Sequence, residues 1–123
     1  MTFLAVVDGD AGGWHVDRDA LTDAISVRWA EVAIESSHRS EVRSLIWEFD
    51  TDSGPGEAYL HEDGTCLYMD ASEEDAIWLA IAFRRLTPMH LDLVFCDEGY
   101  SFDVRLPTGT TEAELVALVN AVG

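Results

Sequence analysis

Lysine is absent from this chain of 123 residues, and its seven basic residues are all arginine. Against them stand 24 acidic residues, which give a formal net charge of −17. A field of that sign repels the phosphates of nucleic acids and the anionic headgroups of membranes. The charge balance therefore argues against nucleic-acid and membrane binding, and it favours a cationic protein partner. The alternative is that the excess of acid serves solubility alone.

Cysteines and long apolar runs are also scarce. Cys66 and Cys96 are too few for a disulfide framework, and no C-x-x-C pair occurs. The first apolar run, residues 3–7, is short and is followed at once by Asp8. It has neither the basic region nor the length of a secretion signal. We therefore expect a reduced, cytoplasmic location and no transmembrane segment.

The usual catalytic motifs are missing: there is no glycine-rich phosphate loop, no H-E-x-x-H or G-x-S-x-G motif and no paired Cys/His zinc spacing. The oxygens of residues 50–54, with Glu57 beyond them, resemble part of a calcium loop, but the other ligands are absent and Pro55 disturbs the turn. A polar turn between strands explains the same residues. We predict no metal, no cofactor and no catalytic residue, and we expect a binding protein rather than an enzyme.

The fold class follows from the periodicity of the apolar residues, which make up 48% of the chain together with cysteine. Alternation or short apolar runs predict strands at 3–7, 31–35, 45–49 and 57–61. Three helices are expected to begin at residues that can cap them, namely Asp17, Ser72 and Thr111, and the last two have Asp75 and Glu114 in the capping-box position. The second helix, ended by Pro88, has the widest apolar stripe and should be the most buried. The last should bury Leu115, Leu118, Val119 and Val122.

Two hairpins complete the sheet. With Asp63-Gly64 as a two-residue turn, Tyr59 lies opposite Tyr68 on one face, and Leu60 lies opposite Leu67 on the other. With Glu98-Gly99 as the second turn, apolar residues of 91–95 and 102–106 share a face, and Asp92 lies opposite Arg105. The order β-α-β-β-β-β-α-β-β-α predicts a single α+β domain, residues 1–123, built as a two-layer sandwich whose mainly antiparallel sheet is covered on one face by helices.

The acidity is concentrated in the middle of the chain. Between Arg43 and Arg84 there is no lysine or arginine, and ten acidic residues occur there. The same stretch holds tyrosines and a histidine on the predicted outer face, and aromatic anchors among carboxylates suit recognition of a basic protein surface. The predicted partner-binding residues are Tyr59, His61, Tyr68, Asp70, Glu57, Glu62 and Asp63. The alternative is a face that is only solvated or covered by another segment.

Two further alternatives use the same face. A small-ligand or enzymatic site could combine His61, Cys66 and Asp103, although an acidic surface should raise a thiol pKa and so disfavour a nucleophilic cysteine. Cys96 could lie on a strand beside Cys66. A homodimer could instead cover the Tyr59/Tyr68 face.

The whole chain, including the segment Asp97-Glu98-Gly99-Tyr100-Ser101-Phe102-Asp103, resembles small acidic bacterial immunity proteins in size, charge and alternating α+β layout. Proteins of that kind bind and block a cognate toxin, which is often a basic nuclease or deaminase. The resemblance implies inhibition by masking a toxin site. It rests on overall character and carries no functional residue over to this chain.

Overall fold

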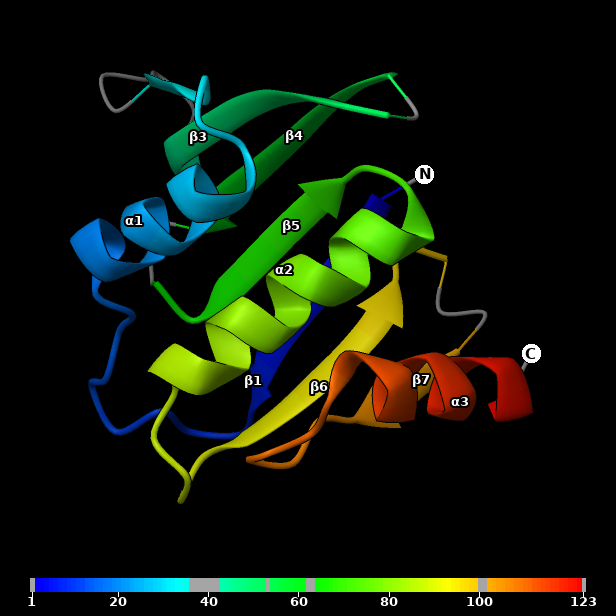
Figure 1. The fold of residues 1–123 in the computed structure, drawn as a ribbon. Helices are drawn as coiled ribbons and strands as arrows, with labels where there is room; N and C mark the ends of the chain where they lie inside the picture. The colour runs from blue at the N-terminus through cyan, green and yellow to red at the C-terminus, as the bar shows by residue number, and fades with distance from the viewer. Residues whose placement is uncertain (1, 36–42, 53, 62–63, 100–101, 123) are drawn as a thin grey trace.

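The computed structural model describes residues 2–35, 43–52, 54–61, 64–99 and 102–122. Its elements follow the predicted order, so the α+β class is confirmed (Figure 1). The strands are β1 (Thr2–Asp8), β2 (Ala33–Glu35), β3 (Arg43–Thr51), β4 (Gly54–His61), β5 (Cys66–Asp70), β6 (Asp92–Asp97) and β7 (Asp103–Arg105). The helices are α1 (Arg18–Arg28), α2 (Glu73–Leu86) and α3 (Glu112–Val122).

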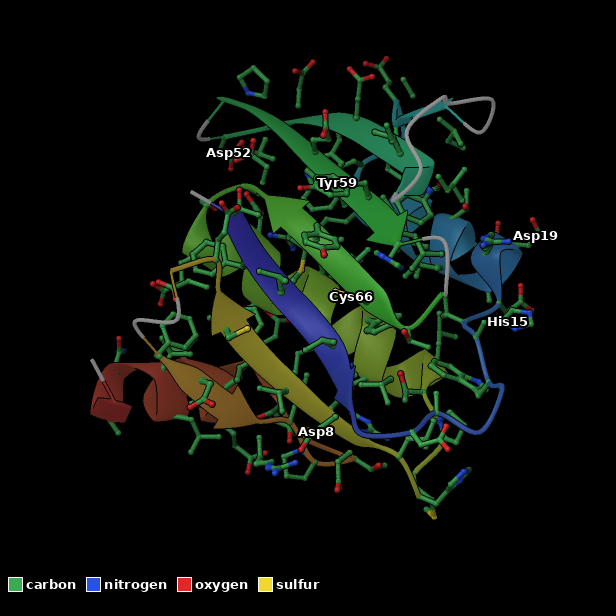
Figure 2. The ribbon with its side chains drawn as sticks, turned by 180° about the vertical axis from the view of Figure 1, so that it is seen from behind. Asp8, His15, Asp19, Asp52, Tyr59 and Cys66 are labelled. Carbon is green, nitrogen blue, oxygen red and sulfur yellow. The ribbon has the colours of Figure 1, made fainter. Side chains whose placement is uncertain are left out.

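The described strands form one antiparallel sheet in the order β2-β3-β4-β5-β1-β6-β7. The first strand of the chain, β1, is therefore inserted between β5 and β6. Figure 1 shows the three helices in front of the sheet, and Figure 2, seen from behind, shows β5, β1 and β6 in front of the helices. We call the side that carries the helices the helix-covered face and the opposite side the outer face.

The core lies between the sheet and α2. In β1, Phe3, Ala5 and Val7 are buried and alternate with less buried residues, so every second side chain points to the helices. Phe3 stacks on Phe95 of β6 with ring centroids 5.8 Å apart. The helix α2 buries nine of its 14 residues, which confirms that it is the central, most buried helix.

The three predicted helix caps are present. The side chain of Asp17 accepts hydrogen bonds from two backbone N–H groups of α1, and the hydroxyl of Ser72 accepts one from Asp75 at 3.3 Å. Thr111 and Glu114 exchange capping-box hydrogen bonds of 3.1 and 3.2 Å at the start of α3. Each cap supplies acceptors for N–H groups that have no partner within the helix, which is why these local signals could be recognised in the sequence.

The β4–β5 hairpin has the predicted register. Tyr59 pairs with Tyr68, and Leu60 pairs with Leu67. Gly64 has φ +70°, the left-handed conformation that the predicted turn requires at this residue. Glu62 and the turn residue Asp63 lie outside the described residues.

The β6–β7 register differs from the prediction by two residues. Val94 pairs with Arg105 and Cys96 pairs with Asp103, so the connection is two residues longer than the predicted Glu98-Gly99 turn. The N–H of Glu98 donates to the carbonyl of Thr2 at 2.9 Å, and this pairing with β1 holds the chain where the turn would begin. A shift of two residues keeps each side chain on its own face, so the predicted separation of the two faces survives the error.

Asp92 and Arg105 are consequently not directly opposite each other. Arg105 is nevertheless long enough to reach diagonally across the sheet. Its Nη1 lies 3.9 Å from Asp92 Oδ2 and 2.7 Å from Asp8 Oδ2. The predicted charge pairing is therefore preserved in a different register.

The β3–β4 hairpin is tighter than the predicted loop at 50–56. The strands extend to Thr51 and from Gly54, so Pro55 lies within β4 and pairs with Asp50. Pairing of β4 with β5 begins only at Glu57. Pro55 therefore has a strand on one side alone, where a residue without an N–H group is tolerated.

Two apolar residues of the predicted periodic patterns are largely exposed. Ile34 is 48% exposed because β2 is a three-residue edge strand, and Leu118 is 42% exposed, whereas Leu115 and Val119 are buried. α3 thus buries a narrower stripe than predicted, and the side chain of Val122 lies outside the description. No helix in the described ranges is long and apolar enough to cross a membrane.

Candidate functional site on the outer face

Three carboxylates lie in register on the outer face. Glu48 of β3 pairs with Glu57 of β4, and Glu57 pairs with Asp70 of β5. Neighbouring strands lie about 4.8 Å apart and directly paired side chains point to the same face. Glu48 and Asp70 are exposed, and Glu57 is half-buried. We call these three residues the acidic row; like charges placed directly opposite each other repel across a sheet.

A pair of tyrosines lies beside the acidic row. Tyr59 lies two residues after Glu57, and Tyr68 lies two residues before Asp70. The two tyrosines therefore share the outer face with these carboxylates. Their rings stack with centroids 4.8 Å apart and 9° between the planes. Both side chains are half-buried, and Figure 2 shows Tyr59 on the face turned away from the helices. The stack holds two large contact surfaces in fixed positions next to the charges.

The structure brings most of the predicted partner-binding residues together. His61 is half-buried at the end of β4, two residues beyond Tyr59 and on the same face. Five of the seven predicted residues therefore lie on the adjacent strands β4 and β5: Glu57, Tyr59, His61, Tyr68 and Asp70. Glu62 and Asp63 lie outside the described residues. That this set binds a partner stays a prediction.

The alternative set of His61, Cys66 and Asp103 is spread across the sheet. Cys66 is on β5 and Asp103 is on β7, with β1 and β6 between them. Three strand spacings separate their backbones by about 14 Å. The residue opposite Asp103 is Cys96, and β1 also separates Cys96 from Cys66. The strand order therefore does not assemble the three residues into one acid, base and nucleophile constellation.

Cys96 lines a cavity of about 380 Å³ at the β7 end of the outer face. The cavity is lined by Val6, Val7, Asp8, Val94, Cys96, Asp103, Val104 and Arg105. Burial raises the pKa of the Cys96 thiol, and the nearby carboxylates of Asp97 and Asp103 raise it further. The direction agrees with the prediction, but burial rather than the acidic surface is the largest cause. A protonated thiol is a poor nucleophile, so the cavity does not favour cysteine catalysis.

The segment compared above with a calcium loop spans the end of β3 and the start of β4. The hydroxyl of Thr51 donates to the carbonyl of Gly54 at 2.8 Å, and Gly54 has φ +118°. Glu57 lies within β4 as part of the acidic row. Over the described ranges, no group of three or more His, Cys, Asp or Glu residues is arranged to hold a metal ion.

Sequence reasoning missed a second concave feature, which we call the aromatic cleft. It has a volume of about 510 Å³ and is lined by Trp29, Ala30, Glu31, Ala33, Glu48, Phe49, Asp50, Pro55 and Gly56. Trp29 stacks on Phe49 with centroids 4.0 Å apart and 5° between the rings. These residues come from separate segments, so the only local signal was the alternation of aromatic and acidic residues at 47–50.

Comparison of the chain with protein-family models, with curated proteins and with solved structures gives no match. No residue role can therefore be transferred from a relative. The function has to be inferred from the charges, rings and exposure of the outer face.

Proposed function

We propose that this chain is a non-catalytic binding protein that docks a cationic protein through the acidic row and the Tyr59/Tyr68 pair. In the manner of the immunity proteins that the sequence resembles, binding would neutralise the partner by masking part of its surface. The observation that carries the proposal is the in-register placement of Glu48, Glu57 and Asp70 next to the stacked rings. Carboxylates held side by side on one face attract a cationic partner and steer its approach.

The two kinds of side chain have different roles in this proposal. Carboxylates at the rim of an interface steer a cationic partner and speed its association, whereas aromatic side chains supply most of the buried contact area. Asp70 is exposed and Tyr68 is half-buried, so both can meet a partner without unfolding of the sheet. Tyr68 and Asp70 are therefore the residues on which the proposal is tested.

The test is affinity capture from extracts of the cell of origin, with the chain as bait. Wild type is compared with the variant Tyr68→Ala/Asp70→Arg and with a matched control, Asp23→Arg/Val27→Ala, whose sites are exposed on α1. The two variants change the net charge equally. We expect wild type and control to retain the same basic protein and the Tyr68→Ala/Asp70→Arg variant to lose it. Circular dichroism and thermal unfolding establish that each bait is folded.

The salt dependence of association separates this proposal from binding of a small neutral ligand. With the captured protein purified, the association rate should fall about tenfold or more from low to high salt, because screening removes long-range attraction. Equal capture by the Tyr68→Ala/Asp70→Arg variant, or a salt-independent rate, contradicts the proposal. A wild-type dimer in light scattering that Tyr68→Ala dissociates would assign the tyrosine face to a homodimer instead.

A further inference from the structure

We infer that an amphipathic helix of the cationic partner packs across β1 on the outer face. This inference rests on the proposed function, extends the interface beyond β4 and β5, and names the structure that the partner would present. Residues 3–7 of β1 are all apolar. Strands that are apolar throughout are typical of sheets with both faces covered, yet Figure 2 shows no described element in front of β1.

The strand pairing assembles the outer side chains of β1 and its neighbours into one apolar surface. Leu4 lies between Tyr68 of β5 and Cys96 of β6, and Val6 lies opposite Val94 of β6. We call these five residues the apolar band. Cys96 is buried and the other four are half-buried, so they pack against one another and still reach the surface. A partner that covers the band would remove their remaining apolar area from water.

The apolar band is hollowed at its β7 end. Val6, Val94 and Cys96 line the cavity of about 380 Å³ described above, and Asp103 and Arg105 line it from β7. An apolar floor between charged walls suits an anchor, a partner side chain that is fully desolvated at the centre of an interface. The cavity therefore gives an apolar side chain of the partner helix a place to insert.

Carboxylates border the apolar band at both ends of β1. Asp70 of the acidic row pairs with Thr2, and Asp8 pairs with Asp92. Arg105 Nη1 lies 2.7 Å from Asp8 Oδ2 and 3.9 Å from Asp92 Oδ2, so two carboxylates share one guanidinium and this border stays negative. Residues 2 and 8 of a strand are about 20 Å apart, and a helix with its side chains is about 10–12 Å wide. Basic side chains on both flanks of such a helix would reach the two borders.

Charge and packing select the occupant. A second copy of the chain would also carry a net charge of −17, and stacking two outer faces would bring acidic borders together. A cationic helix meets the same borders with charges of opposite sign. On the helix-covered face, α2 already packs against β1 and β5, so these strands have the twist and spacing that accommodate a helix. The partner helix would add a third layer to the sandwich.

The test uses a synthetic helical peptide of about five turns, with leucine along one face and arginine on both flanks of that face. Methyl ¹H–¹³C NMR follows its titration into the protein. We expect saturable shifts of the Leu4, Val6 and Val94 signals and none of Val27 and Val116, which are exposed on α1 and α3. A scrambled peptide of the same composition should bind about tenfold more weakly or worse, because it lacks a continuous apolar face.

A variant pair makes the test specific. Val6→Thr/Val94→Thr keeps the branched shape and the net charge but places two hydroxyl groups in the band, so it should weaken peptide binding about tenfold or more. Val27→Thr/Val116→Thr makes the same exchange outside the band and should bind like wild type. Circular dichroism and thermal unfolding establish that both variants are folded.

Three results would overturn the inference: unmoved band signals, equal binding of the two peptides, or equal weakening by both variants. A wild-type dimer that Val6→Thr/Val94→Thr dissociates in light scattering would also overturn it, because a second copy would then cover the band. Capture of a basic protein that depends on Tyr68 and Asp70 would persist if the inference failed alone. Failed capture with intact peptide binding at the band would instead refute the proposed docking through the acidic row.

Discussion

On the helix-covered face Leu60 of β4 pairs with Leu67 of β5, and both are fully buried; on the outer face of the same two strands Glu57 pairs with Asp70. The first pair removes apolar surface from water, and the second brings two negative charges together. Alternate residues of one strand pair thus carry side chains of opposite character. The helix-covered face thus contributes to stability, and recognition by the outer face is what we propose.

The largest effect is expected on the helix-covered face. Phe95 is fully buried and packs against both Phe3 and Phe102, so Phe95→Ala should lower the free energy of unfolding by ~3–5 kcal/mol. Tyr68→Ala on the outer face should cost clearly less, because that side chain is half-buried. Urea unfolding of the two variants measures both values. Equal losses would mean that the outer face is part of the core.

A smaller effect is expected where the segment before α1 crosses the β4–β5 hairpin. Gly64 has φ +70°, and a Cβ atom there would lie 2.6 Å from His15 Cβ. The carbonyl of Gly64 also accepts a hydrogen bond from the N–H of Val16 at 3.0 Å. Gly64→Ala should therefore cost ~1–3 kcal/mol in thermal or urea unfolding. Gly99→Ala is the control, since open space surrounds that glycine, and equal losses would contradict the steric explanation.

A gain in stability is expected within the acidic row. Glu48→Gln removes one of the opposed charges and should raise the free energy of unfolding by ~0.2–1 kcal/mol at low salt. Screening should shrink the gain at high salt. Urea unfolding at both salt concentrations measures it, with the exposed Asp23→Asn as control. An equal gain in the control would attribute the effect to net charge rather than to the row.

The smallest effect concerns Cys96, because it is expected only in alkaline solution. Its folded-state pKa is raised, chiefly by burial, so the folded protein holds the thiol proton more tightly than the unfolded chain. The associated stability is complete below the ordinary thiol pKa and is lost as the pH rises through the raised value. From neutral pH to about pH 10, wild type should lose stability faster than Cys96→Ala in urea unfolding. Parallel pH profiles would contradict this assignment.

Local signals in the sequence predicted much of the fold. Ser72 and Asp75 form the predicted cap of α2, and the Asp63-Gly64 turn predicted the β4–β5 register because its geometry fixes which residues face each other. For the second hairpin, the predicted β6–β7 register differs from the observed register by two residues. An alternating pattern identifies which face a side chain takes, but a shift of two residues leaves every face unchanged, so the pattern alone could not find that error.

The site was only partly visible in the sequence. The pairing of Tyr59 with Tyr68 was predicted from one hairpin, and Glu57 faces Asp70 in the same register. The addition of Glu48 depended on the position of β3, and the aromatic cleft depended on a contact between Trp29 and Phe49, which are 20 positions apart in the chain. No local spacing rule reports such a contact.

By itself, then, the sequence determined the acidity, the order of the elements, the helix caps and the two-sided character of β4 and β5. These follow from composition and from interactions between residues close in the chain. Only the tertiary structure placed β1 in the middle of the sheet, aligned three carboxylates across three strands and joined Trp29, Phe49 and the neighbouring acids into one cleft. The reason is physical: strand order and long-range packing are set by burial of the whole core, and the chain's local pattern is compatible with more than one such arrangement.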